Sequence, residues 1–166
     1  MPRAPVARKT IRHMDSETLV GINRGVVALT GEPHGYTEAD REKISELLGE
    51  VEKRADNQAL EEAIPYKAAL LVFKVASGQH FHAGNKRTAL VAGGVFLAKN
   101  GWAMDITDPE LASTVDRAGM AAASLDDLYG VVRRLAAESK TERRSWEKVA
   151  EDTVESNRDF LTKLAS

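Results

Sequence analysis

The sequence predicts an all-α domain built around two buried helices, and three observations carry this prediction. Apolar residues recur at helical spacing along most of the 166-residue chain. Two neighbouring segments, residues 64–76 and 88–98, are apolar on almost every side, which is typical of helices in a protein interior. Alternation of apolar and polar residues is confined to residues 102–106. We therefore expect six or seven helices and at most one small hairpin.

Capping residues predict where the two N-terminal helices begin. Asp15 or Ser16 can cap a helix that runs to Ala28, because a short polar side chain satisfies the free amide groups of a first turn. Thr37, followed by Asp40 three residues later, matches a capping box for a second helix. Both helices carry an apolar stripe on one face only, so each should cover the core from outside.

The two apolar segments should form the centre of the fold. Pro65 suits the first turn of a helix that begins at Ile64, and Asn100-Gly101 ends the second segment as a helix terminus would. Because these buried helices follow each other in sequence, the loop of residues 77–86 between them must emerge beside the core.

Further helix starts divide the C-terminal part of the chain. Pro109 fits a first turn, and Ser124 with Asp127 repeats the capping-box spacing. Residues 139–166 read as one charged amphipathic helix. We expect residues 13–138 to form the main domain and the C-terminal helix to pack on that same domain.

Composition excludes several classes of protein. The chain has no cysteine, which rules out a disulfide framework, a thiolate zinc site and a cysteine nucleophile. A net charge of −2 and a pI near 6.1 argue against a dedicated nucleic-acid binder, so the basic residues 1–12 are interpreted as a flexible arm. No apolar run approaches the roughly 20 residues that span a membrane, and no signal peptide is recognisable. We expect a cytoplasmic protein.

The loop between the central segments has the composition of an anion site. Its sequence, GQHFHAGNKRT over residues 78–88, places Gly84 where a tight turn is needed and Asn85 where it can cap the next helix. Lys86 and Arg87 follow in the first turn, where cations oppose the helix dipole and where a bound phosphate would offset that cost. The alternative is that both cations point into water or pair with acids from residues 38–62.

Residues 79–90 resemble the signature of the Fic/Doc (Fido) family, His-x-Phe-x-Asp/Glu-Gly-Asn-Gly/Lys-Arg. Phe81, Gly84, Asn85, Lys86 and Arg87 match it in register, and the Lys-Arg-Thr-Ala-Leu ending is closest to the Doc, or death-on-curing, toxin branch. The resemblance implies a Fic/Doc-like helical bundle. It also implies that Phe81 fills the core under the loop and that the other four residues contact phosphate groups of ATP.

Two departures from the signature bear on catalysis. Gln79 stands where the family has the histidine that acts as general base, and an amide cannot take a proton near neutral pH. Ala83 stands where the family has the carboxylate that holds Mg²⁺, so the sequence argues against a bound metal. His80 or His82 could serve as a relocated base, although two imidazoles without a nearby acid are too few ligands for a metal site.

Two functions follow from the resemblance. If active, the protein is a toxin-like transferase that moves a phosphoryl, or less readily an adenylyl, group from ATP to a protein hydroxyl, with a translation factor as the implied target. Alternatively, it is a catalytically impaired fold that binds a nucleotide, a phosphate or a protein. A separate antitoxin is an implied partner. The C-terminal helix, with Trp146 and Phe160, offers a further surface for a partner or a second copy, although packing on its own domain is the favoured interpretation.

Overall fold

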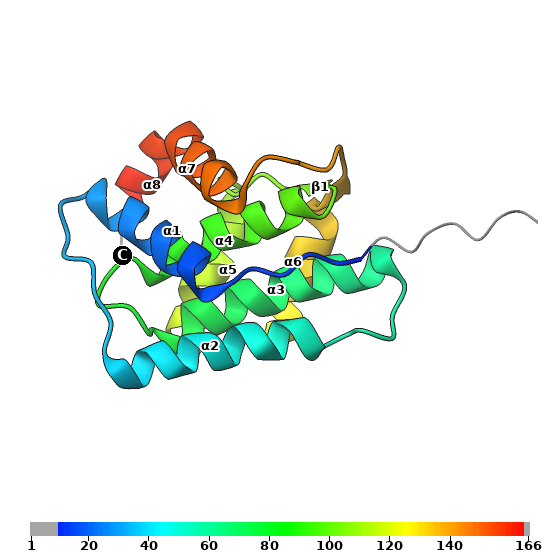
Figure 1. Cartoon of the computed structure of the whole chain (residues 1–166), viewed down its shortest axis with the longest axis horizontal. Coiled ribbons are helices and arrows are strands. Elements are labelled where there is room, and N and C mark those ends of the chain that lie inside the picture. The colour runs from blue at the N-terminus through cyan, green and yellow to red at the C-terminus, as the bar shows by residue number, and fades with distance from the viewer. Residues whose placement is uncertain (1–9, 165–166) are drawn as a thin grey trace, which may run out of the picture.

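The computed structural model describes residues 10–164 and is all-α, which confirms the predicted fold class (Figure 1). Residues 1–9 of the expected basic arm lie outside the described part. Within it, eight helices and one two-stranded sheet follow in the order α1 Ser16–Ala28, α2 Glu38–Lys53, α3 Leu60–Gly78, α4 Asn85–Lys99, β1 Trp102–Ala103, α5 Pro109–Gly119, α6 Leu125–Leu135, β2 Ala137–Glu138, α7 Trp146–Ser156 and α8 Arg158–Lys163.

Helices α3 and α4 form the centre of the bundle, as the two apolar segments predict. α2, α5 and α6 pack against α3, whereas α1 and α7 pack against α4. Gly93 brings the two central helices close together, because a Cβ there would lie 2.5 Å from Val72 Cγ2. Within residues 10–164 no helix is both long and apolar enough to cross a membrane. The apolar surface of the 19-residue α3 is instead covered by its neighbours.

The predicted capping residues stand where the helices begin. The Asp15 side chain accepts the Thr18 amide at α1. Thr37 with Asp40 forms a reciprocal capping box at α2, and Ser124 with Asp127 forms another at α6.

The start of α3 differs from the prediction. The helix begins at Leu60 instead of Ile64, so Pro65 lies in its second turn. Proline has no amide hydrogen, which leaves the carbonyl of Glu61 without its helical donor. Glu61 is exposed, and water can solvate that carbonyl, so this proline is tolerated so near the N-terminus.

The small sheet is not a local hairpin. Trp102 pairs with Glu138 and Ala103 with Ala137 in an antiparallel ladder. α5 and α6 lie between the two strands in sequence, so the ladder fixes both ends of this helical pair beside the end of α4.

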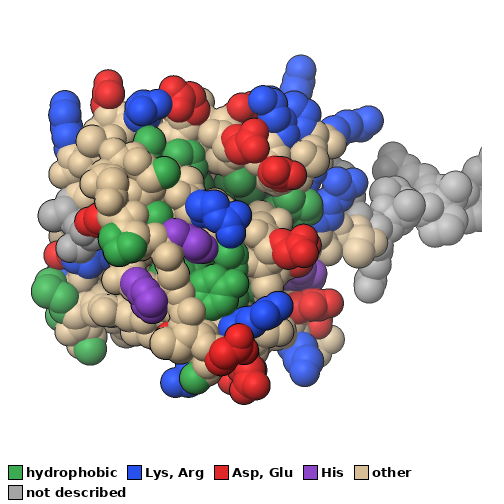
Figure 2. All heavy atoms as spheres, turned by 60° about the vertical axis from the view of Figure 1, so that its left-hand side comes forward, with side chains coloured by type: hydrophobic (Ala, Val, Ile, Leu, Met, Phe, Trp, Pro, Cys, Tyr) green, Lys and Arg blue, Asp and Glu red, His purple; other side chains and the backbone are tan. Residues whose placement is uncertain are grey.

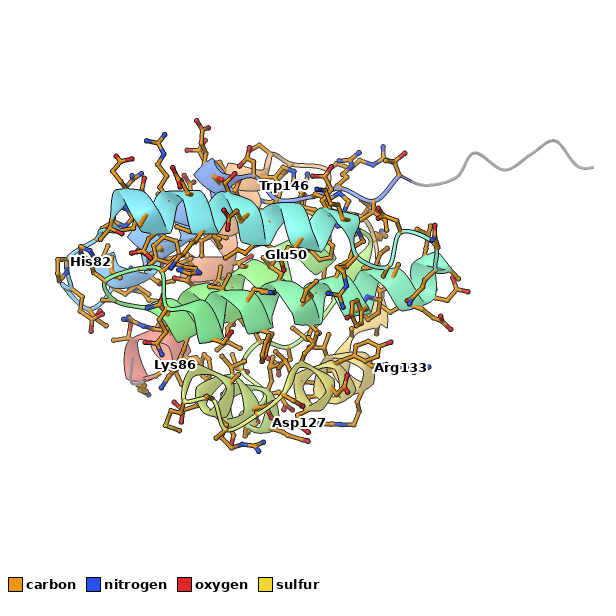
Figure 3. All side chains as sticks on the ribbon, turned by 90° about the horizontal axis from the view of Figure 1, so that it is seen from below. Glu50, His82, Lys86, Asp127, Arg133 and Trp146 are labelled. Carbon is orange, nitrogen blue, oxygen red and sulfur yellow. The ribbon has the colours of Figure 1, made fainter. Side chains whose placement is uncertain are left out.

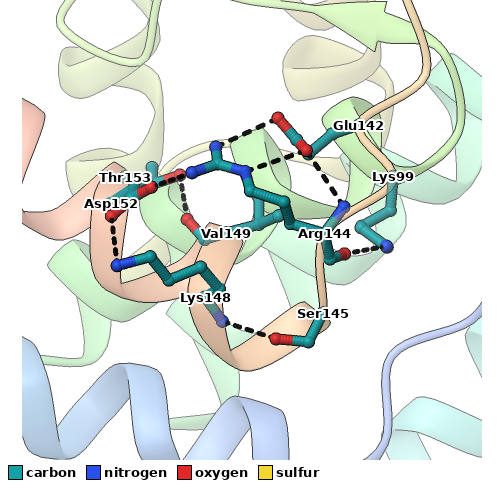
Figure 4. A network of polar contacts seen from close by, with 8 residues as sticks. All are labelled: Lys99, Glu142, Arg144, Ser145, Lys148, Val149, Asp152 and Thr153. Carbon is teal, nitrogen blue, oxygen red and sulfur yellow. Dashed lines mark hydrogen bonds and ion pairs between the residues drawn. The ribbon is translucent and has the colours of Figure 1, made fainter.

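The C-terminal segment is not one continuous helix. Residues 139–145 are not helical, and Asn157 separates α7 from α8. Lys99 Nζ of α4 donates to the Arg144 carbonyl, and the Arg144 guanidinium pairs with Glu142 in the same segment and with Asp152 of α7 (Figure 4). The hydrogen bond from Arg144 lowers the pKa of the Glu142 carboxyl to about 2. Trp146 and Phe160 are partly buried against the core.

Candidate phosphate-binding loop

The loop of residues 79–84 leaves the bundle between the end of α3 and the start of α4. Its two ends have left-handed backbone conformations, with φ at +48° for Gln79 and +75° for Gly84. Only glycine adopts this conformation freely, and a Cβ at Gly84 would lie 2.9 Å from Val27 Cγ1. The turn before α4 therefore depends on glycine at this position.

Asn85 does not cap α4, contrary to the prediction. Gly84 is the N-cap residue, and no side chain among residues 10–164 caps this helix. The Asn85 side chain instead turns back into the loop, where Oδ1 accepts the Phe81 amide at 3.1 Å and Nδ2 donates to the Phe81 carbonyl at 2.9 Å. The amides of the first turn of α4 therefore have no side-chain acceptor, which is the arrangement that helix N-termini present to anions.

Aromatic packing fixes the middle of the loop. Phe81 is 5% exposed and meets the edge of the Tyr36 ring at a centroid distance of 6.1 Å. The next residue, His82, donates its backbone N–H to the Gly35 carbonyl at 2.9 Å. The loop is thus anchored to the segment that joins α1 to α2.

A buried asparagine from α1 provides a second anchor. Asn23 Nδ2 donates to the Ala83 carbonyl at 2.8 Å and to the Thr88 hydroxyl at 3.1 Å. Its Oδ1 lies 2.8 Å from His34 Nδ1, which must carry a hydrogen because the amide oxygen can only accept. Burial, followed by the charges of Arg24 and His82, lowers the pKa of His34. A neutral ring with a hydrogen on Nδ1 satisfies this contact.

Lys86 lies on the side of the loop that faces α5. It is the second residue of α4, and its ammonium pairs with the Asp116 carboxylate of α5 (Figure 3 labels Lys86). The Lys86 side chain is 20% exposed and that of Asp116 is 45% exposed, so solvent reaches the pair.

Arg87 has a different environment, because its side chain is fully buried under the loop. Nη1 donates to the Val26 carbonyl at 3.1 Å and to the Thr30 hydroxyl at 3.0 Å, and Nη2 pairs with Glu32 at 2.5 Å. The guanidinium thus joins the last turn of α1 to the first turn of α4. Because the Arg87 side chain is fully buried, a phosphate outside the fold cannot reach its guanidinium in this arrangement.

Lys86 and Arg87 both pair with acids, but not with acids from residues 38–62. Glu32 and Asp116 both lie outside residues 38–62, which were the acids expected to pair with the loop if it bound no anion. Residues 38–62 face the loop through one carboxylate, Asp40, and its partner is a histidine.

The residues considered for proton transfer point away from each other. Gln79 Nε2 donates to the Gly119 carbonyl at the end of α5, at 2.7 Å. On the opposite side, His80 Nδ1 lies 3.3 Å from Asp40 Oδ1. The ring of His80 covers Gly78, where an added Cβ would meet Nε2 at 2.5 Å. Hydrogen bonds from Thr37 first, and from His80, lower the pKa of Asp40.

The described residues do not fit a metal in the family manner. Ala83 offers no side-chain oxygen, and residues 10–164 contain no group of three histidine, cysteine or acidic side chains that could hold a metal ion. Figure 2 shows one face of the molecule, on which histidine side chains lie near basic and hydrophobic ones.

Sequence reasoning missed the residues that support the loop from other elements. Asn23, Glu32, Asp40, Asp116 and Gly119 all contact it, yet none belongs to the motif. The one available signal was Asn23, a polar residue on the apolar face of α1, where a buried amide needs partners.

Comparisons with known proteins agree with this geometry. The model of the Fic/DOC family matches residues 13–97, just over half of the chain, and includes the loop. The protein kinase Doc of Escherichia phage P1 is 29% identical over 126 residues, which cover 75% of this chain and 96% of that protein. The helical fold, the loop between its central helices and the match over residues 13–97 together show that this chain belongs to the Fic/Doc family.

Proposed function

We propose that this protein is a toxin-like Fic/Doc protein that binds the phosphate groups of a nucleotide, with ATP as the expected ligand, at the start of α4. The observation that carries the proposal is the N-terminus of α4, which has no side-chain cap and follows Gly84 in a left-handed turn. Phosphate oxygens would accept from the first-turn amides, and Lys86 would supply the nearby positive charge.

The same site favours binding over turnover. Gln79 cannot take a proton, and its amide already donates to Gly119. A general base contributes about 10²–10⁴ to rate, and Ala83 removes the family's metal carboxylate as well. We therefore infer that this chain binds a nucleotide but lacks efficient transferase activity.

A second candidate function is phosphoryl, or adenylyl, transfer to a protein hydroxyl. The contact between His80 and Asp40 favours it, because a carboxylate on Nδ1 orients an imidazole and leaves Nε2 to act as a base. In this reaction Nε2 takes the hydroxyl proton, the hydroxyl oxygen bonds to the γ-phosphorus, and ADP leaves. The ring would first have to turn away from Gly78. The name of the phage relative, a protein kinase, supports the same reaction class.

Partners are proposed on the same basis. By family resemblance we propose a cytoplasmic toxin whose protein target is a translation factor and whose activity a separate antitoxin would restrain. Neither partner is needed for the binding function itself.

One experiment separates the two functions. ATP binding is measured by calorimetry, and transfer is followed with ATP labelled at the γ or the α phosphate and a translation elongation factor as acceptor. The variants are the native chain, Gln79→His/Ala83→Asp, His80→Ala and His82→Ala, with Lys148→Gln on α7 as a surface control.

We expect the native chain to bind ATP and to transfer no label, and the double variant to gain transfer. Transfer by the native chain that is lost in His80→Ala or His82→Ala would establish the second candidate. Failure of the native chain to bind ATP would overturn the proposed binding function.

A further inference from the structure

The last turn of α5 engages both polar side chains that the loop directs toward it. Asp116 pairs with Lys86, and the carbonyl of Gly119 accepts from Gln79. Lys86 also passes over this turn, because a Cβ at Gly119 would lie 3.5 Å from Lys86 Cε. These contacts join α5 to the loop although the motif contains no residue of α5.

The two cations of the loop are not equally available to a ligand. Arg87 is fully buried, and moving it would break its ion pair with Glu32 and its hydrogen bond to the Val26 carbonyl. Lys86 is partly exposed, and the acid that pairs with it among residues 10–164 is Asp116, which is itself nearly half exposed. An anion that uses the Lys86 charge at the start of α4 therefore competes with Asp116 for it.

Space for this exchange lies beside the ion pair. A cavity of about 380 Å³ lies beside α4 and α5 and is lined by Lys86 and Asp116, with the apolar side chains of Leu90, Val115 and Leu164 on its walls. The ion pair thus borders a hollow that an anion bound to Lys86 could occupy.

We infer that Asp116 is a built-in competitor for the anion and sets the affinity of the loop for phosphate. The inference rests on the proposed binding function and deepens it by naming an affinity-determining residue outside the motif. Removing the charge of Asp116 leaves Lys86 without a competing partner and removes a negative charge near the site. Both effects should tighten the binding of an anion.

The test compares metal-free ATP binding by the native chain and Asp116→Asn, measured by calorimetry at low salt. Glu110→Gln is the matched control, because Glu110 lies on the same helix and pairs with Arg134 away from the loop. The double variant Lys86→Gln/Asp116→Asn tests whether the effect passes through Lys86. The rate at which an acetylating reagent modifies the Lys86 amine, followed by mass spectrometry, reports the ion pair without any nucleotide.

Asp116→Asn should lower the Kd for ATP roughly two- to fivefold, the range expected from a partly exposed ion pair. Glu110→Gln should change the Kd little, and the double variant Lys86→Gln/Asp116→Asn should show no gain in affinity. Lys86 should be acetylated faster in Asp116→Asn than in the native chain. An unchanged or weaker affinity in Asp116→Asn, with the native chain binding ATP, would overturn the inference and leave the proposed function standing. If neither chain binds ATP, the proposed function fails, and the inference fails with it.

Discussion

Replacing Arg87 with methionine should lower stability and leave phosphate binding nearly intact. Methionine keeps an unbranched apolar stem but removes the charge and the donors to Val26, Thr30 and Glu32. The Val26 carbonyl keeps the Leu29 amide as a donor, so the loss is that of two hydrogen bonds from a charged group, to Val26 and Thr30, which together contribute about 1–3 kcal/mol. The Glu32 side chain is 32% exposed, so the lost ion pair adds about 1 kcal/mol after discounting for solvent screening.

Together these losses predict a free energy of unfolding that is lower by about 2–4 kcal/mol. For a chain of this length that corresponds to a melting temperature lower by about 5–12 °C. Thermal unfolding followed by circular dichroism measures the shift, and ATP titration at a temperature where the variant is folded measures the affinity.

Lys86→Gln is the matched comparison, because it removes the neighbouring cation from a partly exposed position. It should weaken ATP binding and change stability by less than about 1 kcal/mol. The reasoning is refuted if the free energy of unfolding of Arg87→Met lies within about 0.5 kcal/mol of that of the native chain and the variant nevertheless fails to bind ATP. Such a result would make Arg87 a ligand of the phosphate.

Two further predictions concern the loop and the N-terminal segment. Gly84→Ala should destabilise the protein by about 1–3 kcal/mol and weaken ATP binding, because alanine is strained at positive φ and its Cβ would meet Val27. Urea titration measures the change in stability. Gly49→Ala, at an open position within α2, is the control and should be neutral or stabilising in that titration. Burial first, and then the charge of Lys67, lowers the pKa of His13 below its usual 6.5, so the unfolded chain binds more protons and the free energy of unfolding should fall as the pH drops below about 6.5. Urea unfolding at several pH values checks this, and a His13→Asn variant that keeps the full slope would contradict it.

The fold was predictable because its strongest signals are local. Caps at Asp15, Thr37 and Ser124 mark helix starts through contacts with residues three positions ahead. The continuous apolar character of α3 and α4 also made their burial predictable, since no other environment suits such helices. Two of the boundaries that were wrong, at Leu60 and Asn157, have no side-chain cap hydrogen bond to mark them, whereas the start of α7 at Trp146 was missed although Ser145 caps it.

The site was predictable only where its residues are neighbours in sequence. The motif indicated the turn at Gly84 and the positions of Lys86 and Arg87, but not that one cation is buried and the other exposed. That difference depends on Glu32 and Asp116, which arrive from separate elements about 55 and 30 residues away. Ion pairs at such separations are decided by tertiary packing, on which a helical period carries no information.

The two-residue ladder between β1 and β2 has a consequence for engineering. It brings Trp102 and Glu138 side by side, so the ladder holds together the two ends of the chain segment that contains α5 and α6. This segment supplies the acidic and carbonyl contacts made to Lys86 and Gln79. Substitutions within α5 can therefore alter the surroundings of the loop while every residue of the motif stays unchanged.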